Sequence, residues 1–487
     1  MGYVVHLLET GQPAILGQTN VPASLLREVV KYPVPKRVAK LQLGHFGAVD
    51  YQRYWSSEPL PAPQSGVLPL YESQHSWWYY RLVAPLFSSL GGNTNLPASI
   101  GGLRLLNLGF EAAAVWLALG VVGRVVRTRG DAILVGLVIA VHPLFLINGV
   151  RVANDALGIF LATAVIALCF SMRGSPGIGR SVAVGLVTGF AILAKAVNFA
   201  LLPFVAMAWI NSAFLDRRST PQTFLSGTVL AVALLSVIQG EVRTNLRQYG
   251  GLTTMQEAIR NRQEGRTKAD LVQTARSFRW DVRIRRLWLS DSFLVGGWSR
   301  QRPGRAWTTA YSWVVTAGLV GAIFAMAGIF KRTEPVLHSR LTVLLCALLC
   351  VSFTGGLAYH MVQSKLAWGE PTTCPWYASA SIPWFLIVVV AGGLSWPSPR
   401  LRLVVPLALT VTCLGGEWVT IWNRMLPTYS GGATGLPALQ RLATLQPPLF
   451  GPVTIIVAEL GVVVLATLLL AIACGTRPDM GPSCPPR

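Results

Sequence analysis

Long apolar runs dominate the chain after residue 102, and they limit the folds that it can adopt. A helix crosses a bilayer with about 20 apolar residues, and a spanning backbone must satisfy its hydrogen bonds within helices or closed barrels. Only 13% of the residues are charged, against roughly 25% in soluble domains. We therefore predict an all-α, polytopic transmembrane helical bundle of about eleven spans. The predicted spans are residues 103–123, 131–149, 152–171, 181–194, 197–214, 221–240, 306–330, 341–360, 378–395, 402–421 and 452–474.

Basic side chains gather in every second connection between these runs, and the positive-inside rule places such connections in the cytoplasm. The other connections, including the long arginine-rich loop 241–305, then face outward together with residues 1–102, and residues 475–487 form a cytoplasmic tail. We expect an integral protein of the bacterial inner (plasma) membrane with an amphiphilic, extracytoplasmic N-terminal segment. The residues that set this orientation are Arg124, Arg127, Arg129, Arg173, Arg180, Arg217, Arg218, Lys331, Arg332, Arg340, Arg400 and Arg402.

The net charge of +21 indicates anionic partners. Because the basic residues flank apolar runs or lie in one loop, we expect anionic lipids and phosphates rather than nucleic acid. No zinc-finger, RNA-binding or helix-turn-helix pattern is present, and the seven cysteines form no CxxC pair. No disulfide framework and no metal site are therefore predicted.

Residues 1–102 contain no apolar run long enough to cross a membrane. An outward-facing segment of this size needs a signal peptide or a preceding helix to carry it across the bilayer. We therefore expect that a first transmembrane helix is missing from this chain, or that the start codon is wrongly placed. An in-frame apolar segment in the gene would support this hypothesis.

The stretch Tyr71–Leu86, YESQHSWWYYRLVAPL, joins titratable side chains to an aromatic run. Glu72 and His75 come just before four consecutive aromatic residues, of which Tyr79 and Tyr80 are the last two. Tryptophan and tyrosine favour the membrane–water interface, so one interpretation is an aromatic belt at the start of a helix. The alternative is a site at the membrane surface where a lipid-linked substrate meets an acid or a base.

Ionisable residues also lie at the outward ends of later apolar runs. Asn154 and Asp155 open one run, and Lys195 separates two short ones. An ionisable residue at membrane depth faces the bundle interior by default, and there it often serves function. The structural alternatives are a helix cap for Asn154 and Asp155 and an extension toward the interface for Lys195.

Arg243 and Arg247 are spaced i, i+4 after the sixth run, and Tyr249 follows them. On a helix the two arginines would share one face. Two guanidinium groups on one face can bind a phosphate in a bidentate manner. A solvated basic face is the alternative.

The order of these motifs resembles the GT-C class of integral-membrane glycosyltransferases, which includes protein mannosyltransferase-like and lipid A aminoarabinose transferase-like enzymes. Two features depart from the family pattern. Ser76, Trp77 and Trp78 replace the usual prolines, and the chain begins just after the region of the family's first acidic residue. The matching motifs are Glu72-x-x-His75-x-x-x-Tyr79-Tyr80, Arg104-Leu-Leu-Asn107, Asn154-Asp155, Ala194-Lys195 and Arg243-x-Asn245-x-x-x-Tyr249-Gly250.

The resemblance implies transfer of a sugar from a polyprenyl-phosphate donor to an acceptor on the extracytoplasmic face. A carboxylate, Glu72 or Asp155, would deprotonate the acceptor. Basic side chains would stabilise the leaving phosphate. The resemblance implies no cofactor beside the polyprenyl-phosphate sugar, which is the donor substrate, and no Asp-x-Asp motif argues for a metal. The implied substrate-binding residues are His75, Tyr79, Tyr80, Asn154, Lys195, Arg243, Arg247 and Tyr249.

Two other functions fit the same pattern. A transporter or flippase for polyprenyl phosphate or lipid would share the basic face and the intramembrane charges, although the sequence shows no pair of related halves with broken helices. An inactive member that only binds a lipid-linked sugar is the second alternative. The sugar, the acceptor and the oligomeric state are not encoded in any motif of the chain.

Overall fold

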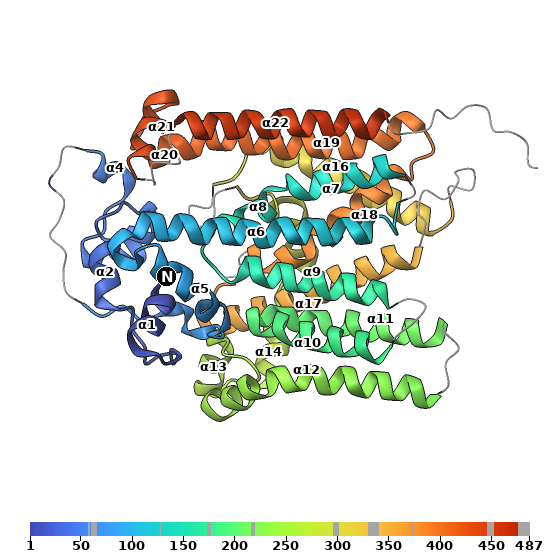
Figure 1. Ribbon diagram of the computed structural model, residues 1–487, viewed down its shortest axis with the longest axis horizontal. Helices are drawn as coiled ribbons and strands as arrows, with labels where there is room; N and C mark the ends of the chain where they lie inside the picture. Colours follow the sequence, from blue (N-terminus) through green and yellow to red (C-terminus); the bar gives the residue numbers. More distant parts are fainter. Residues whose placement is uncertain are drawn as a thin grey trace, which may run out of the picture.

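The computed structural model describes residues 1–56, 59, 66–126, 128–172, 177–215, 220–295, 301–329, 340–371, 375–445 and 452–475. Within these residues the regular secondary structure is helical, apart from isolated bridges such as Asn20–Pro69 and Val34–Asp50. The long helices lie side by side, and smaller helices gather at one end of them (Figure 1). The protein is thus an all-α helical bundle, as the apolar runs predict.

Seven stretches of the described residues are helical, long and apolar enough to cross a membrane, and three shorter apolar helices stand among them. The remaining predicted span, 131–149, forms two helices, because Pro143 lacks the N–H that a continuous helix needs. All eleven predicted spans therefore correspond to helical segments. The long helices are α6 (Leu96–Val122), α12 (Thr220–Tyr249), α16 (Arg305–Met326), α17 (Arg340–Trp368), α18 (Ile382–Leu394, after the 3₁₀ segment η7, Pro375–Ser381), α19 (Pro399–Thr420) and α22 (Pro452–Gly475). The others are α7 (Arg129–Ala140), α8 (Pro143–Gly149), α9 (Asp155–Ser171), α10 (Ile178–Ala194), and α11 (Leu202–Leu215) with the 3₁₀ segment η5 (Ala196–Leu201) before it.

The loop predicted at 241–305 is largely helical. Helix α12 continues to Tyr249, so the first residues of that loop are its last turns. The chain then forms α13 (Gln256–Gln263), α14 (Lys268–Arg276) and α15 (Trp280–Arg286). A capping box starts α14, since the Asp270 carboxylate accepts the Thr267 N–H at 2.7 Å while the Thr267 hydroxyl accepts the Asp270 N–H at 3.3 Å.

Small helices from three parts of the chain cover one end of the bundle, and we call the described residues of 1–95, 250–295 and 426–445 the cap (Figure 1). The Trp55 indole donates a hydrogen bond to the Tyr429 carbonyl at 2.9 Å, which joins the first part of the cap to the last. Helices α6, α9, α16 and α18 end, and α7, α10, α17 and α19 begin, at the other end (Figure 1). The connections that the sequence predicts to be basic therefore lie at this end of the bundle, and the other connections lie at the cap. The cap helices outside α13–α15 are α1 (Gly2–Thr10), α2 (Ala23–Val29), α3 (Lys36–Val38), α4 (Tyr51–Tyr54), α5 (Trp78–Ser89), α20 (Leu426–Tyr429) and α21 (Gly435–Ala443).

Small residues let the central helices approach one another closely. Every residue of α18 is buried, and its Gly392 faces α16 so closely that an added Cβ would overlap the Gly318 carbonyl oxygen. An added Cβ at Gly318 would lie 2.5 Å from the Val389 carbonyl oxygen. Lipid tails are as apolar as leucine, so such close packing, rather than exclusion from water, stabilises helix pairs in a membrane.

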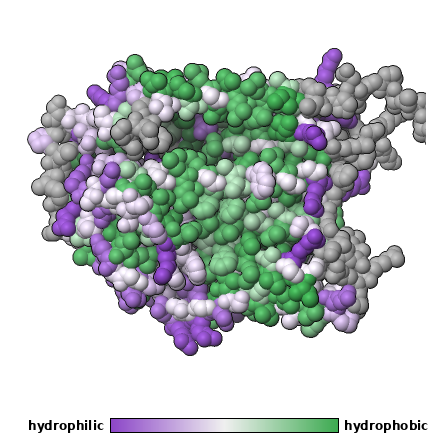
Figure 2. Space-filling view, viewed as in Figure 1, coloured by the Kyte–Doolittle hydropathy of each residue, from purple (hydrophilic) through white to green (hydrophobic). Residues whose placement is uncertain are grey.

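Apolar side chains form a broad band over the middle of the bundle, with hydrophilic residues concentrated toward its two ends (Figure 2). Helix α22 contributes strongly exposed apolar residues such as Val453 and Val457. A band of this kind matches the hydrocarbon core of a bilayer. The cap therefore lies at a membrane–water interface.

Candidate active site

Lys195 occupies a break between two helical segments. Helix α10 ends at Ala194, Lys195 is extended (φ −155°, ψ 120°), and η5 follows. Amide side chains bind carbonyl groups near the break. Asn198 Nδ2 donates to the Ala191 carbonyl at 2.8 Å, and Asn154 Nδ2 donates to the Ala194 carbonyl at 2.7 Å. These bonds stabilise an interrupted backbone that a bilayer would not tolerate against lipid.

Asp155 opens α9 and pairs with two cations. Lys195 Nζ forms an ion pair with its Oδ1, and Arg151 Nη1 lies 3.8 Å from its Oδ2. The Lys195 and Asp155 side chains are only 8% and 5% exposed. Arg151 Cζ lies 4.5 Å from the centre of the Trp376 ring, and Lys195 Nζ lies 5.2 Å from that of Tyr377. Because two cations share one carboxylate, the cluster keeps a net positive charge that suits a phosphate.

A cavity of about 590 Å³, which we call the polar cavity, opens beside this cluster. Three carboxylates and three basic side chains line it, together with two imidazoles and several aromatic rings. Among the carboxylates, Asp155 pairs with Lys195, Glu257 Oε1 lies 3.8 Å from His360 Nε2, and Glu72 forms no ion pair within the described residues. Glu72 is therefore the carboxylate best placed to accept a proton. The lining includes Glu72, Asp155, Glu257, Arg104, Arg151, Lys195, His75, His360, Asn154, Tyr80, Trp368, Trp376 and Tyr377.

A second cavity of about 570 Å³, which we call the apolar cavity, adjoins the first. Segments η5, α11, α13 and α17 line it, with apolar side chains such as Val197, Phe199 and Leu357. The two cavities therefore share a wall beside the ion-paired cluster, where charged side chains meet apolar ones. The residues common to both cavities are His75, Lys195, Glu257, His360 and Tyr377.

His75 lies in this wall, and its surroundings favour the neutral imidazole. Its burial, with the nearby charges of Lys195 and Arg151, lowers the pKa of His75 to about 3. A neutral imidazole has one donor and one acceptor nitrogen. His75 can therefore offer a bound phosphate or sugar a hydrogen bond, while the positive charge comes from its neighbours.

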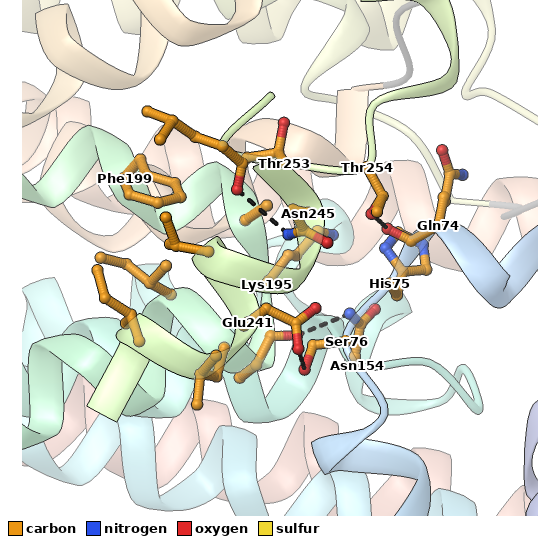
Figure 3. A pocket seen from close by; sticks show the side chains of 17 residues that line it. Gln74, His75, Ser76, Asn154, Lys195, Phe199, Glu241, Asn245, Thr253 and Thr254 are labelled. Atoms are coloured by element: carbon orange, nitrogen blue, oxygen red, sulfur yellow. Dashed lines mark hydrogen bonds between the residues drawn. The ribbon is translucent and has the colours of Figure 1, made fainter. Parts of the chain in front are cut away.

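Hydrogen bonds hold the segment around His75 against the bundle (Figure 3). The Thr254 hydroxyl donates to the Gln74 carbonyl, and the Ser76 hydroxyl donates to Glu241 Oε2 at 3.4 Å. These contacts join a segment near the N-terminus to α12 and to the chain that follows it. The position of His75 therefore depends on residues more than 150 positions away.

Tyr79 and Tyr80 have different surroundings although they are neighbours on α5. Tyr80 lines the polar cavity, and burial together with the Glu72 carboxylate raises its pKa. Tyr79 lies behind the cavity, where its hydroxyl donates to Asn107 Oδ1 at 3.1 Å. Asn107 Nδ2 in turn donates to the Arg151 carbonyl at 2.5 Å. Tyr79 therefore positions the backbone that carries a cavity cation.

Arg243, Arg247 and Tyr249 lie apart from the polar cavity, in the last turns of α12. Both arginines are exposed and line neither the polar nor the apolar cavity. The Tyr249 hydroxyl accepts the Leu16 N–H at 3.1 Å and so anchors the N-terminal part of the cap. The structure thus gathers six of the ten predicted site residues around one cavity, namely Glu72, His75, Tyr80, Asn154, Asp155 and Lys195.

Some cavity residues were not predicted as part of the site. The i, i+4 spacing of Arg151 and Asp155 is a signal that could have identified Arg151. Glu257 and His360 carry no such signal, because they meet only where α13 packs against α17. Arg104 appears in one of the matching motifs, but its place in the cavity depends on how α6 meets the cap.

The fold and the cavities define a class of protein: an all-α integral membrane protein with an ion-paired polar cavity between its bundle and its cap. No protein-family model and no curated protein matches the chain. The chain is similar to ArnT from Cupriavidus metallidurans in the apo state, at 13% identity over 98% of this chain and 73% of that chain, with a TM-score of 0.44.

Two further solved structures are similar to the chain. One is ArnT from Cupriavidus metallidurans bound to undecaprenyl phosphate, at 13% identity over 93% of this chain and 71% of that chain, with a TM-score of 0.43. The other is the oligosaccharyltransferase of Archaeoglobus fulgidus in the apo form, at 12% identity over 78% of this chain and 51% of that chain, with a TM-score of 0.38. These proteins are of the GT-C class that the sequence resembles. The likeness is distant, and the function proposed below rests on the geometry of the cavities.

Proposed function

We propose that the protein is a membrane glycosyltransferase that moves a sugar from a polyprenyl-phosphate donor to an acceptor at the extracytoplasmic face. The observation that carries this proposal is the meeting of the polar and apolar cavities at Lys195. A polyprenyl phosphate is an amphiphile with one charged group between its apolar chain and its sugar. Its chain fits the apolar cavity, its phosphate fits the Lys195–Arg151 cluster, and its sugar fits the polar cavity.

In the proposed reaction, the bond between the anomeric carbon and the phosphate oxygen breaks while the anomeric carbon bonds to an acceptor hydroxyl or amine. The polyprenyl phosphate leaves with one additional negative charge. Lys195 and Arg151 stabilise that charge as it develops. The acceptor proton passes to Glu72, the cavity carboxylate outside any described ion pair.

Asp155 and His75 have supporting roles in this proposal. The Asp155 carboxylate is held by Lys195 and Arg151, so it positions both cations instead of accepting the acceptor's proton. The neutral His75 imidazole donates a hydrogen bond to the phosphate or the sugar. Arg243 and Arg247 are outside this arrangement because they are exposed on α12.

The test supplies membranes containing the protein with undecaprenyl-phosphate hexose, pentose and aminopentose, each labelled in its sugar. We expect at least one donor to release undecaprenyl phosphate as its label enters a second compound. Glu72→Gln should lower the rate about 10²–10⁴-fold while donor binding persists, and Glu264→Gln, at an exposed carboxylate of the cap, should leave the rate unchanged. Binding and transbilayer movement of intact donor, without release of undecaprenyl phosphate, would replace this proposal with the flippase alternative.

A further inference from the structure

Helix α14 lies beside the cap end of α17, and a short turn joins it to α15 (Figure 1). The Lys365 ammonium of α17 donates a hydrogen bond to the Ser277 hydroxyl of this turn at 2.7 Å. Helix α17 is one of the membrane-spanning helices, and it ends shortly after Lys365, at Trp368. The turn between α14 and α15 therefore lies at the membrane–water interface, where the reaction proposed above gives it no role.

This part of the cap carries an excess of positive charge. Residues 276–286 contain five arginines and one acidic residue, Asp281. Asp281 already pairs with Arg279, whose Nη2 lies 3.2 Å from its Oδ2. Arg286 Nε lies 3.2 Å from Asp291 Oδ1. The arginines that are exposed and have no ion-pair partner among the described residues are Arg276, Arg283 and Arg285. Their charge is available to an anion from outside the protein.

Two aromatic rings order the cations around this turn. Phe278 and Trp280 stack with ring centres 4.8 Å apart and planes at 24°, and the Trp280 indole donates to the Ala275 carbonyl at 2.9 Å. Lys365 Nζ lies 4.8 Å from the centre of the Phe278 ring, and Arg283 Cζ lies 6.0 Å from it. Cation–π attraction favours this placement of both groups. Two positive groups near one ring suit a single phosphate group.

Exposed apolar side chains accompany the arginines. Val272 of α14 is 51% exposed, and Ile284 of α15 is 39% exposed. Val272 is spaced i, i+4 from Arg276, so the two share one face of α14. A surface that meets only water gains no stability from exposed valine and isoleucine. Apolar residues interleaved with arginines are instead typical of surfaces at the boundary between lipid phosphates and acyl chains.

We propose that this surface binds the phosphate group of an anionic phospholipid, with Lys365 and Arg283 at the phosphate and the acyl chains beside Val272 and Ile284. A soluble phosphate would use the cations but leave both apolar side chains in water, so the surface favours the lipid. The surface does not line the polar or the apolar cavity, so this proposal does not depend on the proposed function. We call it the basic patch, and its residues are Arg276, Phe278, Trp280, Arg283, Arg285 and Lys365.

The test uses two photoreactive phospholipids with the same diazirine in the acyl chain near the headgroup: phosphatidylglycerol, which is anionic, and phosphatidylcholine, which is zwitterionic. Each is a minor component of phosphatidylcholine nanodiscs that hold the full chain. After irradiation and digestion with pepsin, the label in peptides of residues 268–291 is measured relative to that in peptides of α22. We expect phosphatidylglycerol to label the first set about tenfold or more above phosphatidylcholine, since each basic residue near an anionic lipid strengthens binding about fivefold.

Three sets of substitutions test whether the charge of the basic patch causes this preference. Arg276→Gln, Arg283→Gln and Arg285→Gln together should weaken phosphatidylglycerol binding about a hundredfold. The same three positions changed to lysine keep their charge and should keep the preference. Arg27→Gln, Arg37→Gln and Arg243→Gln together remove equal charge from exposed positions elsewhere, and they should also leave the preference unchanged.

Equal labelling by the two lipids would overturn the proposal, because a merely solvated basic face does not distinguish them. Loss of the preference in the lysine variant or in the control variant would also overturn it, since labelling would then follow the local fold or the net charge of the protein. Inorganic phosphate tests the other source of the same chemistry. If it abolishes phosphatidylglycerol labelling while sodium chloride of equal ionic strength does not, the basic patch is a site for soluble phosphates and the lipid assignment is wrong.

Discussion

Lys195 and Asp155 form the residue pair on which the proposed donor site depends. Lys195→Met should weaken binding of undecaprenyl phosphate by tenfold or more, since a hydrogen bond to a charged group contributes about 1.5–3 kcal/mol. It should also destabilise the protein by about 3–5 kcal/mol, because it removes the closer of the two cations that pair with the buried Asp155 carboxylate. Native mass spectrometry of the bound lipid and a thermal unfolding midpoint measure the two effects.

A double variant separates the loss of binding from the loss of stability. Asp155→Asn with Lys195→Met removes both charges, so much of the stability should return while the lipid affinity stays low. Arg243→Met, at an exposed arginine outside the cavities, should change neither quantity. Full lipid affinity in the double variant would show that the phosphate does not bind at Lys195.

His75 should make stability depend on pH in a defined window. Its pKa is lowered from the ordinary 6.5 to about 3, so below pH 6.5 the unfolded chain binds a proton that the folded protein does not bind until about pH 3. Stability should therefore fall as the pH decreases through this window, by about 1.4 kcal/mol per pH unit for this one group. Unfolding midpoints at pH 7 and pH 5 should differ less in His75→Gln than in the unsubstituted protein.

His45→Gln is the matched control, because His45 is an exposed histidine of the cap. Its variant should keep the full difference between the two pH values. An unchanged difference in His75→Gln would mean that His75 binds a proton as readily in the folded protein as in the unfolded chain. In that case the imidazole would, below pH 6.5, carry part of the charge that the proposed mechanism assigns to Lys195 and Arg151.

At the scale of helices, the contact between α16 and α18 has no space for an additional methyl group. An added Cβ at Gly392 would lie 2.5 Å from the Ala322 nitrogen and would overlap the Gly318 carbonyl oxygen. Gly392→Ala should therefore destabilise the bundle by about 1–3 kcal/mol. Gly461→Ala on α22, where no atom lies within 4 Å, should be neutral or stabilising by about 0.5–1 kcal/mol. A thermal unfolding midpoint that is equal in both variants would contradict the packing described here.

Helix positions followed from the sequence more closely than helix ends did. Hydropathy predicts where a segment leaves the lipid, whereas a helix ends where its backbone hydrogen bonds end. Helix α12 therefore continues through Glu241 and Arg247 to Tyr249, although the apolar run ends near residue 240. This extension brings Glu241 within 3.4 Å of the Ser76 hydroxyl, a contact that the predicted loop at these positions did not indicate.

At the scale of the whole molecule, the cap and the basic connections should lie on opposite sides of the membrane. Lys268→Cys on α14 should react with a membrane-impermeant maleimide in intact spheroplasts. Gly179→Cys, exposed at the other end of the bundle, should react only after the membrane is permeabilised. The positive-inside rule gives this orientation, and the reverse labelling pattern would place the proposed reaction in the cytoplasm.

The sequence by itself determined the fold class, the helical spans and the candidates Glu72, Asp155 and Lys195, because hydropathy and the cost of a charge in lipid are properties of each segment. Only the tertiary structure decided that Tyr80 lines the cavity while Tyr79 lies behind it, that Arg243 and Arg247 stay outside, and that Glu257 meets His360. A cavity forms between segments that are distant in the chain, so its lining depends on how helices pack. No local sequence pattern predicts that packing.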